Sequence, residues 1–274
     1  MLRRGDGGWD DVKFIADLSE ARIAELARSF REAQPFPYLA IDDLMRSQAL
    51  PAFDPFPSSD DAFWHHFKDR YQHNKRACND LDRIPSPYRD LLVECSSPAF
   101  LDLLEKITGI EDLIPDPYFE GGGLHSSGAG GVLAPHTDFH FYRRLGLYRR
   151  LNVLIYFNPG WTEADGGALE LYRKGETTPG ASVVPVLGRA VVFRTDDQSV
   201  HGFTKPVADG KWRNSVALYY YTARDAAGFS GDTTTHWQNR KISGLRRAAF
   251  DALIFGSRAL SKLAHMVDPN TKRS

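Results

Sequence analysis

The chain has 274 residues, 42% of them apolar, with a formal net charge of −1 and an isoelectric point near 6.8. This composition predicts a soluble, cytoplasmic globular protein and excludes the strongly basic surface that binding to nucleic acid or an anionic membrane requires. The two cysteines, Cys78 and Cys95, argue against a disulfide framework or a thiolate zinc site. The N-terminus lacks the apolar core of a secretory signal, and no stretch of about 18 apolar residues predicts a membrane span.

The N-terminal part, residues 1–115, predicts helices and one early strand. Ser19 is a typical N-cap for a helix that ends near residue 32. A short strand with a turn is expected in residues 35–45, and a helix beginning with proline and ending with glycine in residues 98–109. Residues 57–67 are also expected to be mostly helical.

After Gly121 the pattern changes to short apolar runs separated by glycine, proline, asparagine and aspartate. Closely spaced strands with turn signals favour a β-sandwich or β-barrel over alternating strands and helices. The expected strands are residues 132–140, 150–158, 167–173, 189–195 and 213–222.

The pattern predicts one structural domain in three parts. Helical support in residues 1–115 precedes a catalytic β-core in residues 116–224, and a helical segment follows in residues 225–274. An apolar stripe marks residues 242–267 as one long helix. We expect this helix to pack on its own barrel; the alternative is a contact between two copies, so the protein is predicted to be a monomer or a homodimer.

The segment Pro135-His136-Thr137-Asp138 carries the strongest chemical signal. Residues two apart on a strand point to the same side, so the imidazole and the carboxylate would face one point. They would supply two ligands of a facial triad, in which non-heme iron(II) oxygenases use a second histidine as the third ligand. His201 follows the expected strand 189–195 and is the candidate. An HxD pair can arise by chance and is a weak signal on its own, so the context decides.

Arg213 opens the last expected strand, and Ser215 shares its face. An arginine inside a barrel is costly unless it meets an anion, and its planar fork suits a carboxylate. A structural salt bridge is an equal alternative on these residues alone.

Taken together, these motifs resemble the double-stranded β-helix (jelly-roll or cupin-like) of the Fe(II)/2-oxoglutarate-dependent oxygenases, and its prolyl-4-hydroxylase-like branch most closely. The HxD pair is followed in order by Tyr156, Trp161 and the pair Gly166-Gly167, and then by the distal histidine and the R-x-S motif. Residues 35–45 resemble the first strand of that branch. A mainly β fold with flanking helices is therefore expected. Some prolyl hydroxylases have lysine where Arg213 stands, which puts close kinship to the protein-modifying enzymes in doubt.

The resemblance implies a role for each residue. Iron(II) would bind His136, Asp138 and His201, and 2-oxoglutarate and O2 would be co-substrates that yield succinate and CO2. The distal carboxylate of 2-oxoglutarate would pair with Arg213 and Tyr156. From their strand positions, Ser215 and Asn152 are expected to line the same pocket.

Other polar residues have weaker assignments. His140 is expected to support a ligand or contact substrate rather than bind metal. The glycine-rich run 121–131 fits no phosphate-binding motif and is expected to be a flexible loop from which His125 reaches substrate. Lys75 and Arg76 are expected to be solvated, with contact to an acidic substrate as the alternative, and Trp64-His65-His66 to be a helix face without metal.

The predicted activity is hydroxylation of an unactivated C–H bond in a small molecule, either amino-acid-like or a natural-product intermediate. One alternative is hydroxylation of a prolyl or other residue in a protein. A second is a non-enzymatic, cupin-like metal-binding protein, which would not need a clamp for a dicarboxylate.

Overall fold

The computed structural model describes residues 14–58, 62–67, 71–224 and 233–237, so the helix expected in residues 242–267 lies outside the described residues. The three described α-helices are α1 (Glu20–Glu32), α2 (Tyr88–Glu94) and α3 (Pro98–Thr108). The predicted helix that begins after Ser19 and the predicted helix in residues 98–109 are both confirmed. The hydroxyl oxygens of Ser19 and Ser97 accept hydrogen bonds from backbone amides in the first turns of α1 and α3, and Gly109 ends α3 with a φ of 69°. No described helix has the length and apolarity needed to cross a membrane.

The strands form one antiparallel, nearly closed sheet. Their bounds are β1 Tyr38–Ile41, β2 His65–Phe67, β3 Gln72–Cys78, β4 Ile114–Pro115, β5 Gly123–Thr137, β6 Phe141–Tyr142, β7 Leu147–Tyr156, β8 Leu169–Tyr172, β9 Ala181–Val183, β10 Ala190–Arg194, β11 Val200–Phe203, β12 Arg213–Thr222 and β13 His236–Trp237. Two 3₁₀ turns, Ser47–Phe53 and Glu163–Asp165, lie between them. The mainly β, jelly-roll class is confirmed.

The long strand β5 connects the two halves of the barrel. Its first five residues, 123–127, pair with β12, and its last part pairs with β11, so the order runs β1-β10-β7-β12-β5-β11-β8-β9. Between them lies the run Gly128-Ala129-Gly130-Gly131, where Gly130 has a φ of 73°. A left-handed glycine lets a strand bend sharply at such a corner.

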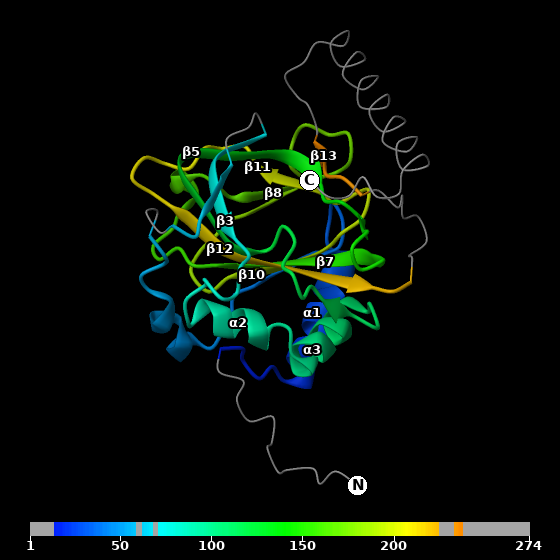
Figure 1. Ribbon diagram of the computed structural model, residues 1–274. Helices are drawn as coiled ribbons and strands as arrows, with labels where there is room; N and C mark the ends of the chain where they lie inside the picture. The colour runs from blue at the N-terminus through cyan, green and yellow to red at the C-terminus, as the bar shows by residue number, and fades with distance from the viewer. Residues whose placement is uncertain (1–13, 59–61, 68–70, 225–232, 238–274) are drawn as a thin grey trace, which may run out of the picture. The chain divides into compact units, whose positions relative to one another are not determined.

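Alternation along the central strands separates a helix-covered face from the inside of the barrel. On β7, Leu151, Val153 and Ile155 pack in the main core with the helices, whereas Leu154 and Tyr156 belong to an inner cluster. The helices α1, α2 and α3 lie together on one side of this sheet (Figure 1). Inward-facing side chains therefore come from alternate positions, and those positions include the candidate site residues.

Two sequence predictions for local structure are wrong. Within residues 57–67, His65–Phe67 is strand β2, which pairs with β3, and residues 72–78 are a strand that was not expected. The run 121–131 is not a free loop, because Gly123 begins β5 and the run is paired on both sides. Tertiary pairing outweighed the local glycine and serine signals here.

Candidate functional site

The structure brings His136, Asp138 and His201 together inside the barrel. His136 lies near the end of β5 directly opposite His201 on β11, and Asp138 follows the end of β5. One ligand atom from each residue lies within 4.8 Å of the other two. The Nδ1 atoms of His136 and His201 are 2.9 and 3.0 Å from the carbonyl oxygens of Ala134 and Ser199, which turns Nε2 of each ring inward. A metal-binding histidine typically forms such a hydrogen bond through the ring nitrogen that does not bind the metal.

The electrostatics of the triad fit a divalent cation. The three side chains are buried. Burial raises the pKa of the Asp138 carboxyl, but His201, His136 and Arg149 outweigh burial and the net pKa shift is downward. Burial, and then His136, lower the pKa of His201 to about 4. At neutral pH the site thus offers a carboxylate and a neutral imidazole, the forms that bind metal, and the two-histidine, one-carboxylate set is typical of iron(II).

One oxygen of Asp138 is already occupied by protein groups. Nδ2 of Asn152 donates to Oδ2 at 3.3 Å, and the Arg149 guanidinium lies 3.5 Å from the same oxygen. Oδ1 faces Nε2 of His136 at 3.6 Å. Oδ2 also lies 3.9 Å from Nε2 of His201, so each carboxylate oxygen faces the ring nitrogen of one of the two candidate histidine ligands.

Arg149 is a functional candidate that the sequence did not reveal. It is fully buried, and its guanidinium carbon lies 3.7 and 3.6 Å from the ring centroids of Phe139 and Tyr219. Alternation counted from Asn152 would turn Arg150 inward instead. A register shift between β7 and β12, at Tyr220/Tyr221, moves Arg149 to the inner face.

We expect Asn152→Ala to weaken iron(II) binding by roughly 10–100-fold, since the loss of a hydrogen bond that orients a metal ligand has typically that effect. Titration of the metal against a competing chelator without oxygen measures it, and thermal unfolding of the metal-free protein controls for loss of the fold. Unchanged affinity would mean that Asp138 is oriented without Asn152.

Arg213 is buried beside Tyr156, as expected from the sequence. Its Nη2 donates to the Tyr156 hydroxyl at 3.2 Å, its Nε donates to the Gly167 carbonyl at 2.6 Å, and its guanidinium carbon lies 4.4 Å from the centroid of the Phe203 ring. No carboxylate forms a salt bridge with it in the described part of the chain, so the structural ion pair considered above is not found there. Burial lowers the pKa of Arg213. Ser215 is buried and pairs with Tyr156 across the strands.

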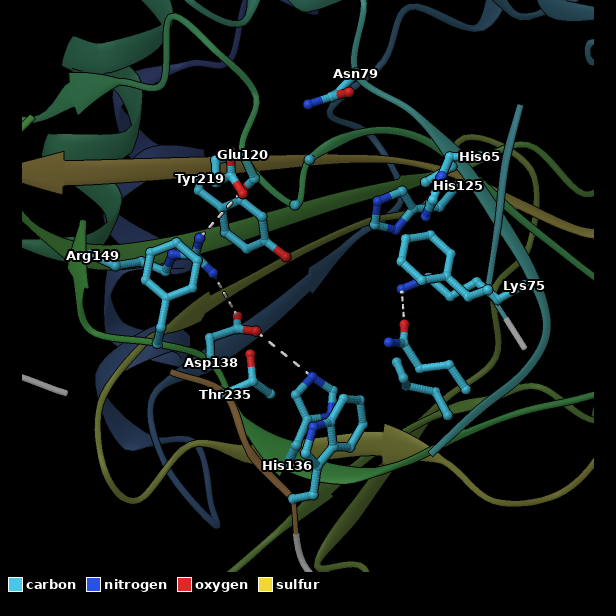
Figure 2. A pocket seen from close by; sticks show the side chains of 18 residues that line it. His65, Lys75, Asn79, Glu120, His125, His136, Asp138, Arg149, Tyr219 and Thr235 are labelled. Carbon is cyan, nitrogen blue, oxygen red and sulfur yellow. Dashed lines mark hydrogen bonds and ion pairs between the residues drawn. The ribbon is translucent and has the colours of Figure 1, made fainter. Parts of the chain in front are cut away.

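A cavity of about 360 Å³ opens beside the metal ligands. His136 and Asp138 lie on one side of it, and His125 and Lys75 lie across from them (Figure 2). His125 therefore reaches the cavity, although from a strand. His140 does not line it; its Nδ1 is 2.9 Å from the Asp197 carboxylate. The described lining residues are His65, Phe67, Gln72, Lys75, Ala77, Asn79, Glu120, Gly121, Gly122, His125, Leu133, His136, Asp138, Phe139, Arg149, Tyr219, Thr235 and Trp237.

The expectation of a solvated Lys75-Arg76 pair is wrong for Arg76. Arg76 is buried between the rings of Trp64 and Trp212, at 4.5 and 4.1 Å from their centroids. Lys75 is half-buried in the cavity wall. Neighbouring residues on a strand face opposite sides, so one stacks behind the wall while the other faces the cavity.

A segment far along the chain completes the site. Strand β13 pairs with β5 at Thr137 and His136, and the Trp237 ring lies 4.7 Å from the rings of both His136 and Tyr71. The sequence offered no signal for this contact, because it depends on a pairing across about 100 residues.

Comparison with known proteins gives matches in sequence and in fold. Residues 122–221 match the model of the 2OG-Fe(II) oxygenase superfamily. The prolyl 3-hydroxylase OGFOD1 of Xenopus laevis is 34% identical over 77 residues, which are 27% of this chain and 15% of that protein. The match therefore spans a small part of this curated relative.

Two solved structures share the fold. A prolyl hydroxylase from Trichoplax adhaerens, in complex with a hypoxia inducible factor peptide fragment, superimposes with a TM-score of 0.52 at 16% identity, over 74% of this chain and 94% of that one. HygX from Streptomyces hygroscopicus, with nickel, 2-oxoglutarate and hygromycin B bound, gives 0.50 at 13% identity, over 81% and 98%. The family model that matches residues 122–221 names both iron and 2-oxoglutarate, as expected from the motifs.

Proposed function

We propose that this protein is an iron(II)- and 2-oxoglutarate-dependent oxygenase that hydroxylates an unactivated C–H bond of a small molecule and releases succinate and CO2. The observation that carries the proposal is the buried arrangement of His136, Asp138 and His201 in the same barrel as the Arg213–Tyr156 pair. A metal site or a buried cation is common on its own. Together in one barrel, they match the two ends of 2-oxoglutarate, of which one would chelate the metal and the other would pair with the cation.

The proposed roles follow from the donor groups. His136, Asp138 and His201 hold iron(II), which together with 2-oxoglutarate activates O2 for insertion into a C–H bond. The remaining chemistry of the chain is binding and orientation. Arg213 offers its guanidinium to the distal carboxylate of 2-oxoglutarate, and the Tyr156 hydroxyl donates to the same group. Ser215 and Asn152 remain proposed neighbours of this pocket.

The residues around the reacting centre exclude water and hold charge. Trp237 and Leu133 line the cavity beside the ligands, and His201, His136 and Arg149 together lower the pKa of Asp138 and keep it ionised. Low local dielectric strengthens each of these interactions.

The size of the cavity favours a small organic substrate. A cavity of about 360 Å³ is at the lower end of the range for small-molecule pockets. Hydroxylation of a residue in a protein is the alternative, because the similar structures include a prolyl hydroxylase with a peptide as well as HygX with hygromycin B. A metal-binding protein without activity would gain nothing from burying Arg213 beside Tyr156.

The test is direct. Purified protein is incubated with iron(II), ascorbate and 2-oxoglutarate in air, and succinate is quantified with and without a panel of amino acids, metabolites and proline-containing peptides. We expect basal succinate release that requires iron and is stimulated by a small molecule. Stimulation by peptides alone would favour the alternative substrate class, and no iron-dependent release under any condition would refute the oxygenase assignment.

A further inference from the structure

The side chain of Arg149 joins three segments of the chain beside the candidate metal ligands. Its Nη2 donates to the Tyr221 hydroxyl on β12 at 3.1 Å and to the Glu120 carbonyl, in the segment after β4, at 3.3 Å. Its Nη1 lies 3.5 Å from Oδ2 of Asp138. Figure 2 shows Arg149 between Glu120 and Asp138 at the cavity. A planar guanidinium can hold several acceptors in one fixed arrangement, which an ammonium group cannot do.

The guanidinium of Arg149 is confined by its surroundings. The side chain is fully buried, and the ring centroids of Phe139 and Tyr219 lie 3.7 and 3.6 Å from its central carbon. In the described part of the chain, Asp138 is the acid with which it forms a salt bridge. Because separating a buried ion pair is costly, the position of the confined guanidinium fixes the position of the Asp138 carboxylate.

A second buried carboxylate holds this arrangement from behind. The Tyr221 hydroxyl accepts from Arg149 and donates to Oδ2 of Asp116 at 3.3 Å. The Asp116 carboxylate in turn accepts from the backbone amides of Tyr118 and Glu120, both at 2.9 Å. Asp116 is buried and does not line the cavity. The contacts of Tyr221 and Arg149 are therefore the described route from Asp116 to the metal ligand.

We propose that Arg149 is a positioning residue that sets the orientation of the Asp138 carboxylate at the metal, and that Tyr221, held by Asp116, acts on that carboxylate through Arg149. The inference rests on the proposed function, in which Asp138 is a metal ligand. It makes the geometry of the metal centre depend on side chains of β7 and β12, whereas binding of 2-oxoglutarate does not depend on them.

The first measurement needs no turnover. Protein loaded with cobalt(II) in place of iron(II) is kept free of oxygen, and its visible absorption spectrum reports the coordination geometry. We expect Arg149→Met to change the bands. Arg149→Lys should also change them, because lysine keeps the charge but not the three contacts. Tyr221→Phe should change them less.

Tyr220→Phe is the matched control for Tyr221→Phe. It removes the same hydroxyl from the neighbouring residue, but that hydroxyl donates to the Cys95 carbonyl and the ring packs in the main core. The cobalt spectrum should therefore be unchanged, even where thermal unfolding of the metal-free protein shows lower stability.

The second measurement is succinate release per bound iron. Arg149→Met should lower it about 10–100-fold, the usual effect of losing a group that orients a metal ligand, with the half-saturating concentration of 2-oxoglutarate unchanged. Tyr221→Phe should lower it about 2- to 13-fold, as expected for one net hydrogen bond. In protein that already carries Arg149→Met, Tyr221→Phe should have no further effect, because both changes act through one guanidinium.

Each result distinguishes this inference from a purely structural role and from the proposed function. An unchanged cobalt spectrum in folded Arg149→Met or Arg149→Lys protein, or effects of Arg149→Met and Tyr221→Phe that multiply, would overturn the inference. If Arg149→Met does not fold, Arg149→Lys and Tyr221→Phe decide it by their spectra. If the spectra change as expected but the unaltered protein releases no succinate, the oxygenase assignment is wrong and the positioning role stands. If succinate is released and the spectra do not change, the positioning role alone is wrong.

Discussion

We expect His201→Ala to abolish iron-dependent succinate release, because the substitution removes one of the three proposed metal ligands, whose ligand atoms lie within 4.8 Å of one another. Loss of residues that merely orient a ligand typically costs about 10–100-fold in metal affinity or activity, so loss of a ligand itself should exceed about 100-fold. The fold should survive, since the His201 side chain faces inward at the site and its strand pairing with β5 and β8 uses backbone groups. Metal content and succinate release, measured on the same preparation, check both parts.

His66→Ala provides the matched control. His66 is exposed on β2 and does not line the cavity, so the variant should bind iron and turn over 2-oxoglutarate as the unaltered protein does. A His201→Ala protein that keeps full metal content and turnover would place the iron elsewhere.

We expect Arg213→Ala to raise the half-saturating concentration of 2-oxoglutarate by roughly 30-fold to several thousand-fold. This range corresponds to about 2–5 kcal/mol, the typical effect of removing one partner of a buried charge pair. The physical reason is that Arg213 is buried, so removing its guanidinium would leave the carboxylate without its charged partner, and among the described residues no acid forms a salt bridge with Arg213. Steady-state kinetics with varied 2-oxoglutarate at fixed iron measure the effect.

Two further substitutions define the geometry of the clamp. Tyr156→Phe should raise the same constant about 2- to 13-fold, the effect of one net hydrogen bond of about 0.5–1.5 kcal/mol. Arg173→Ala, at an exposed arginine paired with Glu176, should leave it unchanged. Equal constants for Arg213→Ala and the unaltered protein would move the distal carboxylate to another cation.

The sequence predicted those parts of the fold in which local and tertiary signals agree. The strand 213–222 begins and ends as expected, and α3 begins after its serine cap and ends at its glycine. The central strands were recognisable because the helices cover one face and the barrel interior the other, which makes both faces apolar. The metal triad was recognisable because the HxD spacing places two ligands on one side of a strand.

The predictions failed where pairing between distant segments overrode the local pattern. The run 121–131 reads as a loop, but its glycines are needed where β5 bends between the two halves of the barrel. Residues 57–67 lack a strand pattern of their own, and β2 exists through its pairing with β3. Arg76 reads as a solvated charge, yet two distant tryptophans enclose it.

By itself, the sequence predicted the mainly β class and the candidate metal triad from residue identity and regular alternation, and the Arg213–Tyr156 pair from its resemblance to a known family. Only the tertiary structure decided which other charges face the site. Arg149 and Lys75 reach it through register breaks at Tyr220/Tyr221 and at Asn74. A single skipped residue exchanges the two faces of a strand, and a break is set by how two strands pair, so no pattern within one strand could have revealed it.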